Sequence, residues 1–95
     1  MFDIRLDERG DVVLAGRFDG AQVDKAKVVF DQVSASAAVD FKNLTYISSA
    51  GLGILMVTQK RLTERGEELR LRNASGHIRD VFLIARFDLI FNLEE

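Results

Sequence analysis

Two adjacent serines, Ser48 and Ser49, follow a short apolar run and stand where a stretch with helical spacing begins. A serine at a helix start can accept a hydrogen bond from a backbone N–H group of the first turn. The same place has unpaired N–H groups and the positive end of the helix dipole, which favour an anion. A phosphate carried by a serine there would be well tolerated. The residues therefore predict either a modifiable hydroxyl group at Ser49 or, as the plain structural alternative, a helix cap at Ser49.

The first helical turn after the serines has little side-chain volume, because Gly51 and Gly53 carry no side chain. Such a turn lets the sheet or another protein's backbone approach closely. A nucleophilic serine of a hydrolase would instead need a base and an orienting acid. The single histidine, His77, has no catalytic motif around it, and the Gly-x-Ser-x-Gly sequence is absent. We therefore expect no catalytic residue and no enzymatic activity.

Composition limits the classes of protein to which the chain can belong. Its 95 residues, 47% hydrophobic and 29% charged, predict one compact domain over residues 1–95. The chain has no cysteine and one histidine, so we expect no metal site and no cofactor. A net charge of −2 disfavours nucleic-acid binding, which needs a basic surplus. No apolar run approaches the roughly 20 residues of a membrane span, and the N-terminus resembles no signal peptide, so we expect no membrane insertion and a cytoplasmic location.

Hydrophobic periodicity predicts strands and helices that alternate along the chain. The expected strands cover residues 2–6, 12–15, 37–41 and 68–72, the third continues toward Ser48, and residues 89–91 form a last short strand or turn. The expected helices cover residues 21–33, 50–65 and the stretch that carries Ile78, Val81, Phe82 and Ala85. A turn at residues 8–11 predicts an antiparallel N-terminal hairpin, and residues 17–20 form a loop. The alternation predicts an α/β fold with helices packed on a mixed sheet of four to five strands, whose inner strands are parallel.

The stretch from Asp40 to Gly53, DFKNLTYISSAGLG, is similar to the signature of STAS domains. That signature has an aspartate on a strand, an aromatic–aliphatic pair, and a serine cluster followed by Gly-Leu-Gly. The segment from Gly16 to Asp19 resembles the family's Gly-x-x-Asp loop. Ser75 to Phe82 and Leu89 to Phe91 resemble its late helix and its terminal segment. The resemblance covers essentially the whole chain and implies a single STAS domain of the anti-sigma-factor-antagonist type.

The resemblance also implies a function. Anti-sigma-factor antagonists bind an anti-sigma factor that has GHKL-type serine kinase activity, and thereby free the sigma factor. The kinase phosphorylates the antagonist, which then dissociates, and a serine phosphatase resets it. The phosphorylated position matches Ser49, and the ATP site belongs to the kinase, so this chain needs no cofactor. The expected partner-binding residues are Asp19, Ser48, Ser49, Ala50, Gly51, Leu52 and Gly53.

Three alternatives follow from one departure and from the exposed apolar positions. Many switchable members have an aspartate where this chain has Ser48, so Ser48 is expected as a loop or capping residue or, second, as a competing phosphate acceptor. The missing acid also agrees with a second function, an accessory subunit that binds the ATPase of a lipid-type ABC transporter without phosphorylation. Apolar residues near Leu52 and Ile54 could contact either a partner or a second copy in a weak homodimer.

Overall fold

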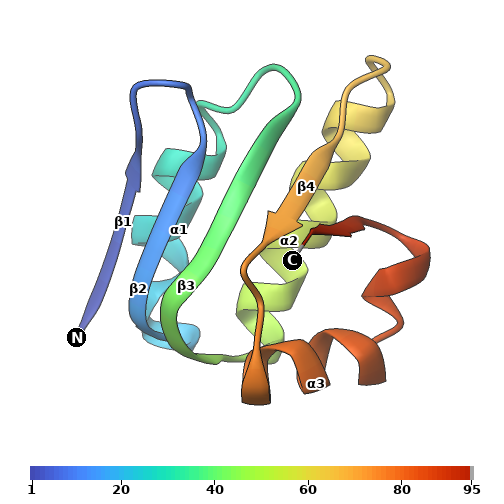
Figure 1. The fold of residues 1–95 in the computed structure, drawn as a ribbon. Helices are drawn as coiled ribbons and strands as arrows, with labels where there is room; N and C mark the ends of the chain where they lie inside the picture. Colours follow the sequence, from blue (N-terminus) through green and yellow to red (C-terminus); the bar gives the residue numbers. More distant parts are fainter. Residues whose placement is uncertain (95) are drawn as a thin grey trace.

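Strand order in the sheet follows chain order, β1-β2-β3-β4-β5, in the computed structural model, which describes residues 1–94 (Figure 1). The strands are β1 (Phe2–Leu6), β2 (Val12–Phe18), β3 (Ala37–Ile47), β4 (Leu69–Arg72) and β5 (Asn92–Glu94). The α-helices are α1 (Val23–Phe30), α2 (Ser49–Thr63) and α3 (Gly76–Ile84), and the short 3₁₀ helices are η1 (Gly20–Gln22) and η2 (Phe87–Leu89). None of the helices described is long and apolar enough to span a bilayer.

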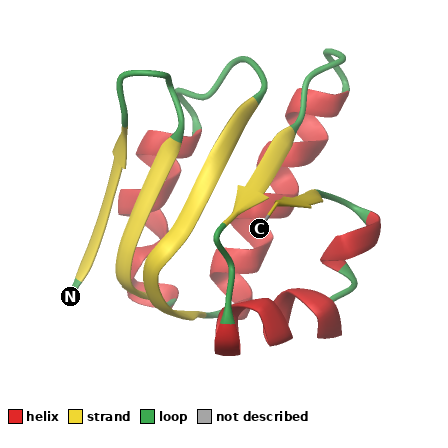
Figure 2. Cartoon of the chain, in the orientation of Figure 1, coloured by secondary structure: helices red, strands yellow, loops and turns green. Residues whose placement is uncertain are grey.

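The sheet is mixed because its first pair is antiparallel and the other pairs are parallel. Strands β1 and β2 form the hairpin, with Phe2 opposite Gly16 and Leu6 opposite Val12. Strands β2, β3, β4 and β5 then run parallel and are joined by crossovers that contain the helices. Helices α1 and α2 lie behind the strands in Figures 1 and 2, whereas α3 lies near the lower end of the sheet. The predicted α/β fold, with its hairpin and mixed sheet, is confirmed.

The core lies between the sheet and the helices. It contains fully buried side chains from α1, α2 and the central strands, namely Ala26, Leu55, Leu62, Val12, Leu14, Val39, Leu69 and Leu71. A row of aromatic rings extends this core toward the C-terminal segment. The ring of Phe82 is 5.0 Å from that of Phe41 and 5.4 Å from that of Phe87, which in turn is 4.8 Å from Phe91. These rings attach α3 and η2 to strand β3.

The strand β2 is longer than predicted, because Arg17 and Phe18 belong to it and not to a loop. Gly16 makes this possible. Its φ of 87° bends the strand so that the N–H group of Arg17 donates a hydrogen bond to the carbonyl of Met1, at 2.8 Å. Phe18 then pairs with Ile47 of β3 and its side chain is fully buried. The segment ends in Asp19-Gly20, a pair typical of turns, so the local pattern is misleading here.

Two further boundaries differ from the prediction. The α-helix predicted for residues 21–33 covers only Val23–Phe30, because the chain enters it through the 3₁₀ turn η1 and leaves it through a turn at Asp31 and Gln32. Residues 89–91, predicted as a last short strand or turn, form the end of η2 and a turn, and the last strand consists of Asn92–Glu94. Strand β5 pairs with β4, and Glu94 forms ion pairs with Arg70 and Arg72, at 3.4 Å each. These contacts are long-range and leave no local signal in the sequence.

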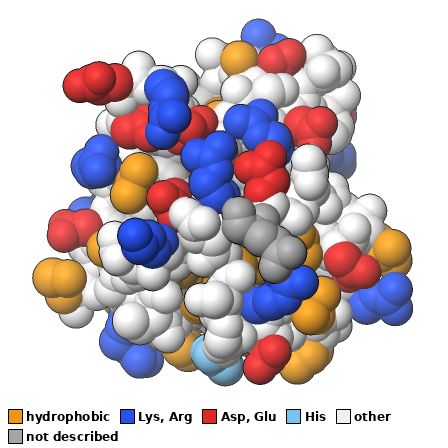
Figure 3. All heavy atoms as spheres, viewed as in Figure 1, with side chains coloured by type: hydrophobic (Ala, Val, Ile, Leu, Met, Phe, Trp, Pro, Cys, Tyr) orange, Lys and Arg blue, Asp and Glu red, His pale blue; other side chains and the backbone are white. Residues whose placement is uncertain are grey.

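The face of the sheet opposite α1 and α2 is polar. Basic and acidic side chains are interspersed on it, as Figure 3 shows. Arg72 lies between Asp11, at 3.8 Å, and Glu94. Charges of both signs therefore neutralise one another across the strands, and this face carries no large field of one sign.

Candidate functional site

The two segments predicted to bind a partner meet at the carboxyl-terminal end of strands β2 and β3. Asp19 follows the end of β2, and Ser48 follows the end of β3. These strands are parallel neighbours, so their carboxyl ends lie side by side, with Phe18 opposite Ile47. The N–H group of Ser48 also donates a hydrogen bond to the carbonyl of Phe18, at 2.9 Å. The sheet thereby places the Asp19 turn beside the start of α2.

The helix cap belongs to Ser48 and not to Ser49. The backbone of Ser48 is extended, with φ −88° and ψ 169°, and its Oγ accepts a hydrogen bond from the N–H group of Gly51 at 3.2 Å. Ser48 is half-buried. Ser49 is the first residue of α2 and is exposed. The alternative in which Ser49 is a plain cap is therefore wrong, and the hydroxyl of Ser49 lies on the outside of the first helical turn.

Asp19 holds the turn before α1. Its carboxylate accepts a hydrogen bond from the N–H group of Ala21 at 3.1 Å, and so caps η1. The side chain is half-buried. Asp19 thus holds this turn, and its position next to the start of α2 is compatible with its expected role in partner binding.

The two glycines of the motif have different surroundings. A Cβ atom on Gly51 would lie 2.8 Å from Cγ1 of Ile47 and 3.2 Å from ring atoms of Phe18, whereas a Cβ atom on Gly53 would have no atom within 4 Å. Gly51 therefore allows α2 to pack closely on the sheet, and Gly53 faces open space. Of the other motif residues, Ala50 is exposed and Leu52 is half-buried against the core.

Replacing Gly51 with alanine should lower the free energy of unfolding by about 1–2 kcal/mol, because crowding in the core outweighs the better helix propensity of alanine. The matched control is Gly53→Ala, in the same helix, which should raise the free energy of unfolding by about 0.5–1 kcal/mol. Urea unfolding followed by circular dichroism measures both. Equal effects of the two changes would show that the contact with Ile47 and Phe18 does not constrain Gly51.

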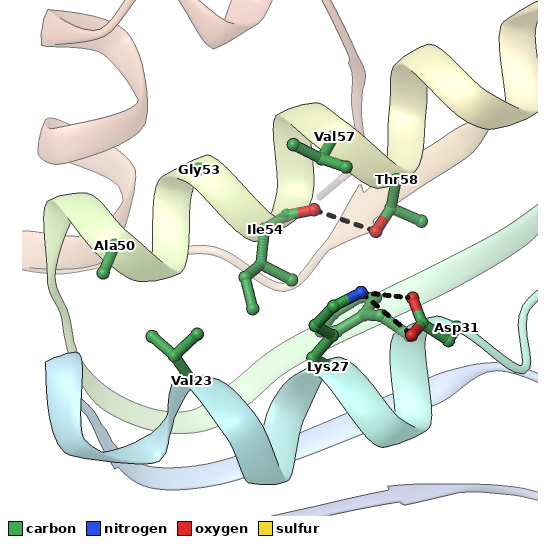
Figure 4. A pocket seen from close by; sticks show the side chains of 9 residues that line it. Val23, Lys27, Asp31, Ala50, Gly53, Ile54, Val57 and Thr58 are labelled. Carbon is green, nitrogen blue, oxygen red and sulfur yellow. Dashed lines mark hydrogen bonds and ion pairs between the residues drawn. The ribbon is translucent and has the colours of Figure 1, made fainter.

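A groove leads away from this site between α1 and α2, beginning at Ala50 (Figure 4). Sequence reasoning missed it because the groove depends on how two helices pack, and neither helix alone indicates it. The part of the chain that the structure describes has no group of three or more His, Cys, Asp or Glu side chains that could hold a metal ion. His77 lies in the first turn of α3 and is exposed. The site offers a hydroxyl group, a carboxylate and an apolar surface.

Known proteins resemble this chain over three quarters or more of its length. Residues 3–93 match a family model described as Mlab, STAS domain. A STAS-domain containing protein of Pseudomonas aeruginosa is 25% identical over 85 residues, which are 86% of this chain and 84% of that protein. A protein of Bordetella bronchiseptica, named BtrV and assigned as an anti-sigma factor antagonist, is 38% identical over 71 residues, which are 75% of this chain and 55% of BtrV.

Solved structures share the fold. The anti-sigma factor antagonist SpoIIAA in its unphosphorylated form superposes with a TM-score of 0.74 at 21% identity, covering 98% of this chain and 87% of that one. The phosphorylated form of SpoIIAA, from Bacillus, gives 0.71 at 19% identity, covering 98% and 90%. A protein of Thermotoga maritima assigned as an anti-sigma factor antagonist gives 0.82 at 14% identity, covering 99% and 86%. The fold is that of anti-sigma factor antagonists, and the match over residues 3–93 shows that the chain belongs to the STAS domain family.

Proposed function

We propose that this chain is an anti-sigma-factor antagonist that works by partner switching. Its unmodified form binds an anti-sigma factor through Asp19 and residues 48–53, and phosphorylation of Ser49 by that partner's GHKL-type serine kinase activity releases it. A serine phosphatase restores the binding form, and the cycle takes place in the cytoplasm. The observation that carries the proposal is the exposed hydroxyl of Ser49 on the first turn of α2, next to a separate residue that caps the helix.

Ser49 is a better phosphate acceptor than Ser48 for a structural reason. The Oγ of Ser48 already accepts the capping hydrogen bond from Gly51 and is half-buried. A phosphate on Ser48 would have to displace that bond, whose loss typically costs about 1 kcal/mol. The exposed Ser49 can enter a kinase site without a change in the cap. The helix start also accommodates the added negative charge.

Release follows from charge and contact loss and not from a change of fold. A phosphate adds about −1.5 to −2 charge at neutral pH. Each contact that it disrupts in a packed or acidic interface costs on the order of 1–3 kcal/mol, so a few such contacts lower affinity by several powers of ten. Two comparisons support this proposal. SpoIIAA, which shares the fold, has been solved in unphosphorylated and phosphorylated forms, and BtrV is assigned as an anti-sigma factor antagonist.

The test uses tagged wild-type protein and the variants Ser49→Asp and Ser49→Ala, each expressed in the native host. Wild type and Ser49→Ala should co-purify with an anti-sigma factor kinase, and Ser49→Asp should bind it at least 100-fold more weakly. Phosphopeptide mass spectrometry should find phosphate on Ser49 of the wild-type protein. The control Ser48→Ala should lose about 1 kcal/mol of folding stability and keep its phosphate on Ser49.

Two outcomes would contradict the proposal. Ser49→Asp binding the anti-sigma factor as tightly as wild type would rule out release by negative charge at this position. Recovery of an ABC-transporter ATPase with both wild type and Ser49→Asp, with no phosphate on either serine, would replace the proposal with an accessory-subunit function.

A further inference from the structure

The groove between α1 and α2 starts one residue after Ser49 and follows α2 for about two turns (Figure 4). Its volume is 270 Å³. It is lined by Val23, Lys27, Phe30 and Asp31 of α1 and by Ala50, Gly53, Ile54, Val57 and Thr58 of α2. Arg61 holds the two walls together, because its guanidinium donates hydrogen bonds to the carbonyls of Val33 at 2.7 Å and Phe30 at 2.8 Å. The groove is thus formed in the free protein.

The polar groups of the groove are already paired. The Nζ atom of Lys27 is 3.0 Å and 3.3 Å from the carboxylate oxygens of Asp31, and the hydroxyl of Thr58 donates to the carbonyl of Ile54 at 2.8 Å. What remains open is apolar surface, above all the side chain of Val57, which is 69% exposed. The volume lies at the lower limit of the roughly 300–1,000 Å³ typical of pockets for small molecules. An open apolar surface whose polar groups are already paired fits apolar side chains of a protein.

Gly53 gives an independent reason to expect an occupant. A glycine in the interior of a helix is less stable than an alanine. Gly53 does not have a positive φ, and a Cβ atom there would contact no other group within 4 Å. Neither the backbone conformation nor the packing of the domain thus accounts for this glycine. It keeps the groove open between Ala50 and Val57, where an approaching backbone or side chain would need the space.

We propose that the anti-sigma factor of the proposed function seats an apolar side chain or turn in this groove, over Gly53 and against Val57. The inference rests on that proposed function, because the groove is continuous with the expected interface through Ala50 and Gly53. The partner then contacts two regions, the Ser49 end, which phosphorylation changes, and the groove, which it does not. Eight residues separate Ser49 from Val57, about 12 Å along the helix. Effects at the two ends should therefore be close to additive.

The test measures dissociation constants of the purified anti-sigma factor, identified by co-purification with wild type, for a set of variants. Val57→Glu should weaken binding at least 30-fold. Val28→Glu is the matched control, since Val28 is 63% exposed on α1 and does not line the groove, and it should stay within threefold of wild type. Combining Val57→Glu with Ser49→Asp should multiply the two losses.

The variant Gly53→Ala should change folding stability and partner affinity in opposite directions. Its melting temperature should rise by about 2–6 °C, because alanine favours the helix, while its affinity for the anti-sigma factor should fall about 5- to 10-fold. A variant that is more stable and binds less well cannot be explained by partial unfolding. This variant also keeps the proposal testable if Val57→Glu folds poorly.

The outcomes distinguish the two proposals. If Ser49→Asp releases the anti-sigma factor but Val57→Glu and Gly53→Ala bind like wild type, the groove proposal fails and the proposed function stands. If wild type binds no anti-sigma factor, both fail. If Val57→Glu instead abolishes self-association of the purified domain in sedimentation experiments and leaves partner binding unchanged, the groove belongs to a homodimer and the proposal is overturned.

Discussion

Replacing Phe82 with alanine should lower the free energy of unfolding by about 3–5 kcal/mol. The side chain is fully buried and joins the C-terminal segment to the sheet. Its ring packs edge-on against Phe41 and stacks on Phe87. Truncation would remove the apolar burial and both aromatic contacts, and it would leave a cavity. Since small domains have total stabilities of about 5–15 kcal/mol, the variant should be near the limit of folding at 37 °C.

Ile84→Ala is the matched control for this prediction. Ile84 lies two residues later in the same helix, α3, but 82% of its side chain is exposed. Its truncation should change stability by less than about 0.5 kcal/mol. Urea denaturation followed by circular dichroism would compare the two variants. A loss below 1.5 kcal/mol for Phe82→Ala would show that α3 and η2 contribute little to the cooperative core.

Gly16→Ala should be the second strongly destabilising change, with an expected loss of about 2–5 kcal/mol. Two effects add. The φ of 87° is unfavourable for any residue with a Cβ atom, and that atom would collide with the carbonyl group of Met1. Relief requires the start of β1 to move away from β2, which breaks the hydrogen bond from Arg17 to Met1. The obstacle is backbone, so a rotamer change cannot remove it.

Gly10→Ala isolates the first of these effects. Gly10 has almost the same φ, 85°, but no atom lies within 4 Å of the position a Cβ would take. Its replacement should cost only the conformational strain, about 1–2 kcal/mol. The difference between the two variants, measured by thermal and urea unfolding, gives the cost of the collision. Equal losses of stability in the two variants would mean that the start of β1 can move away from the new Cβ atom at no energetic cost.

Much of the fold could be predicted from the sequence because the strands and helices carry strong local patterns. The alternation at residues 2–6 predicted β1 correctly, and Gly66, with its φ of 77°, lies just after α2 as expected of a C-terminal glycine. The predicted end of β2 was wrong and the strand at Asn92–Glu94 was missed, for a different reason. Gly16–Phe18 and Asn92–Glu94 become strands because they pair with segments distant in the sequence. Such pairing cannot be predicted from the local residues alone.

The candidate site was predicted only in part. The serine pair and the two glycines were identified from their order, and the sheet brings Asp19 next to them as expected. The expectation that Ser48 is a loop or capping residue is confirmed, whereas the cap at Ser49 is wrong, because the cap depends on which serine has extended backbone angles. The groove beyond Gly53 arises from the packing of α1 on α2, so its lining becomes visible only once both helices are placed.

The order of the strands has a consequence for how the domain folds. Each strand lies beside the strand that precedes it in the chain, so no pairing has to wait for a segment made much later. The hairpin of β1 and β2 can form within microseconds, and every later strand then adds to an existing edge after closing one helix-containing loop. The three parallel pairs each need a crossover before they form, so they should assemble more slowly than the hairpin. We expect the sheet to assemble from β1 towards β5 as the chain emerges during synthesis.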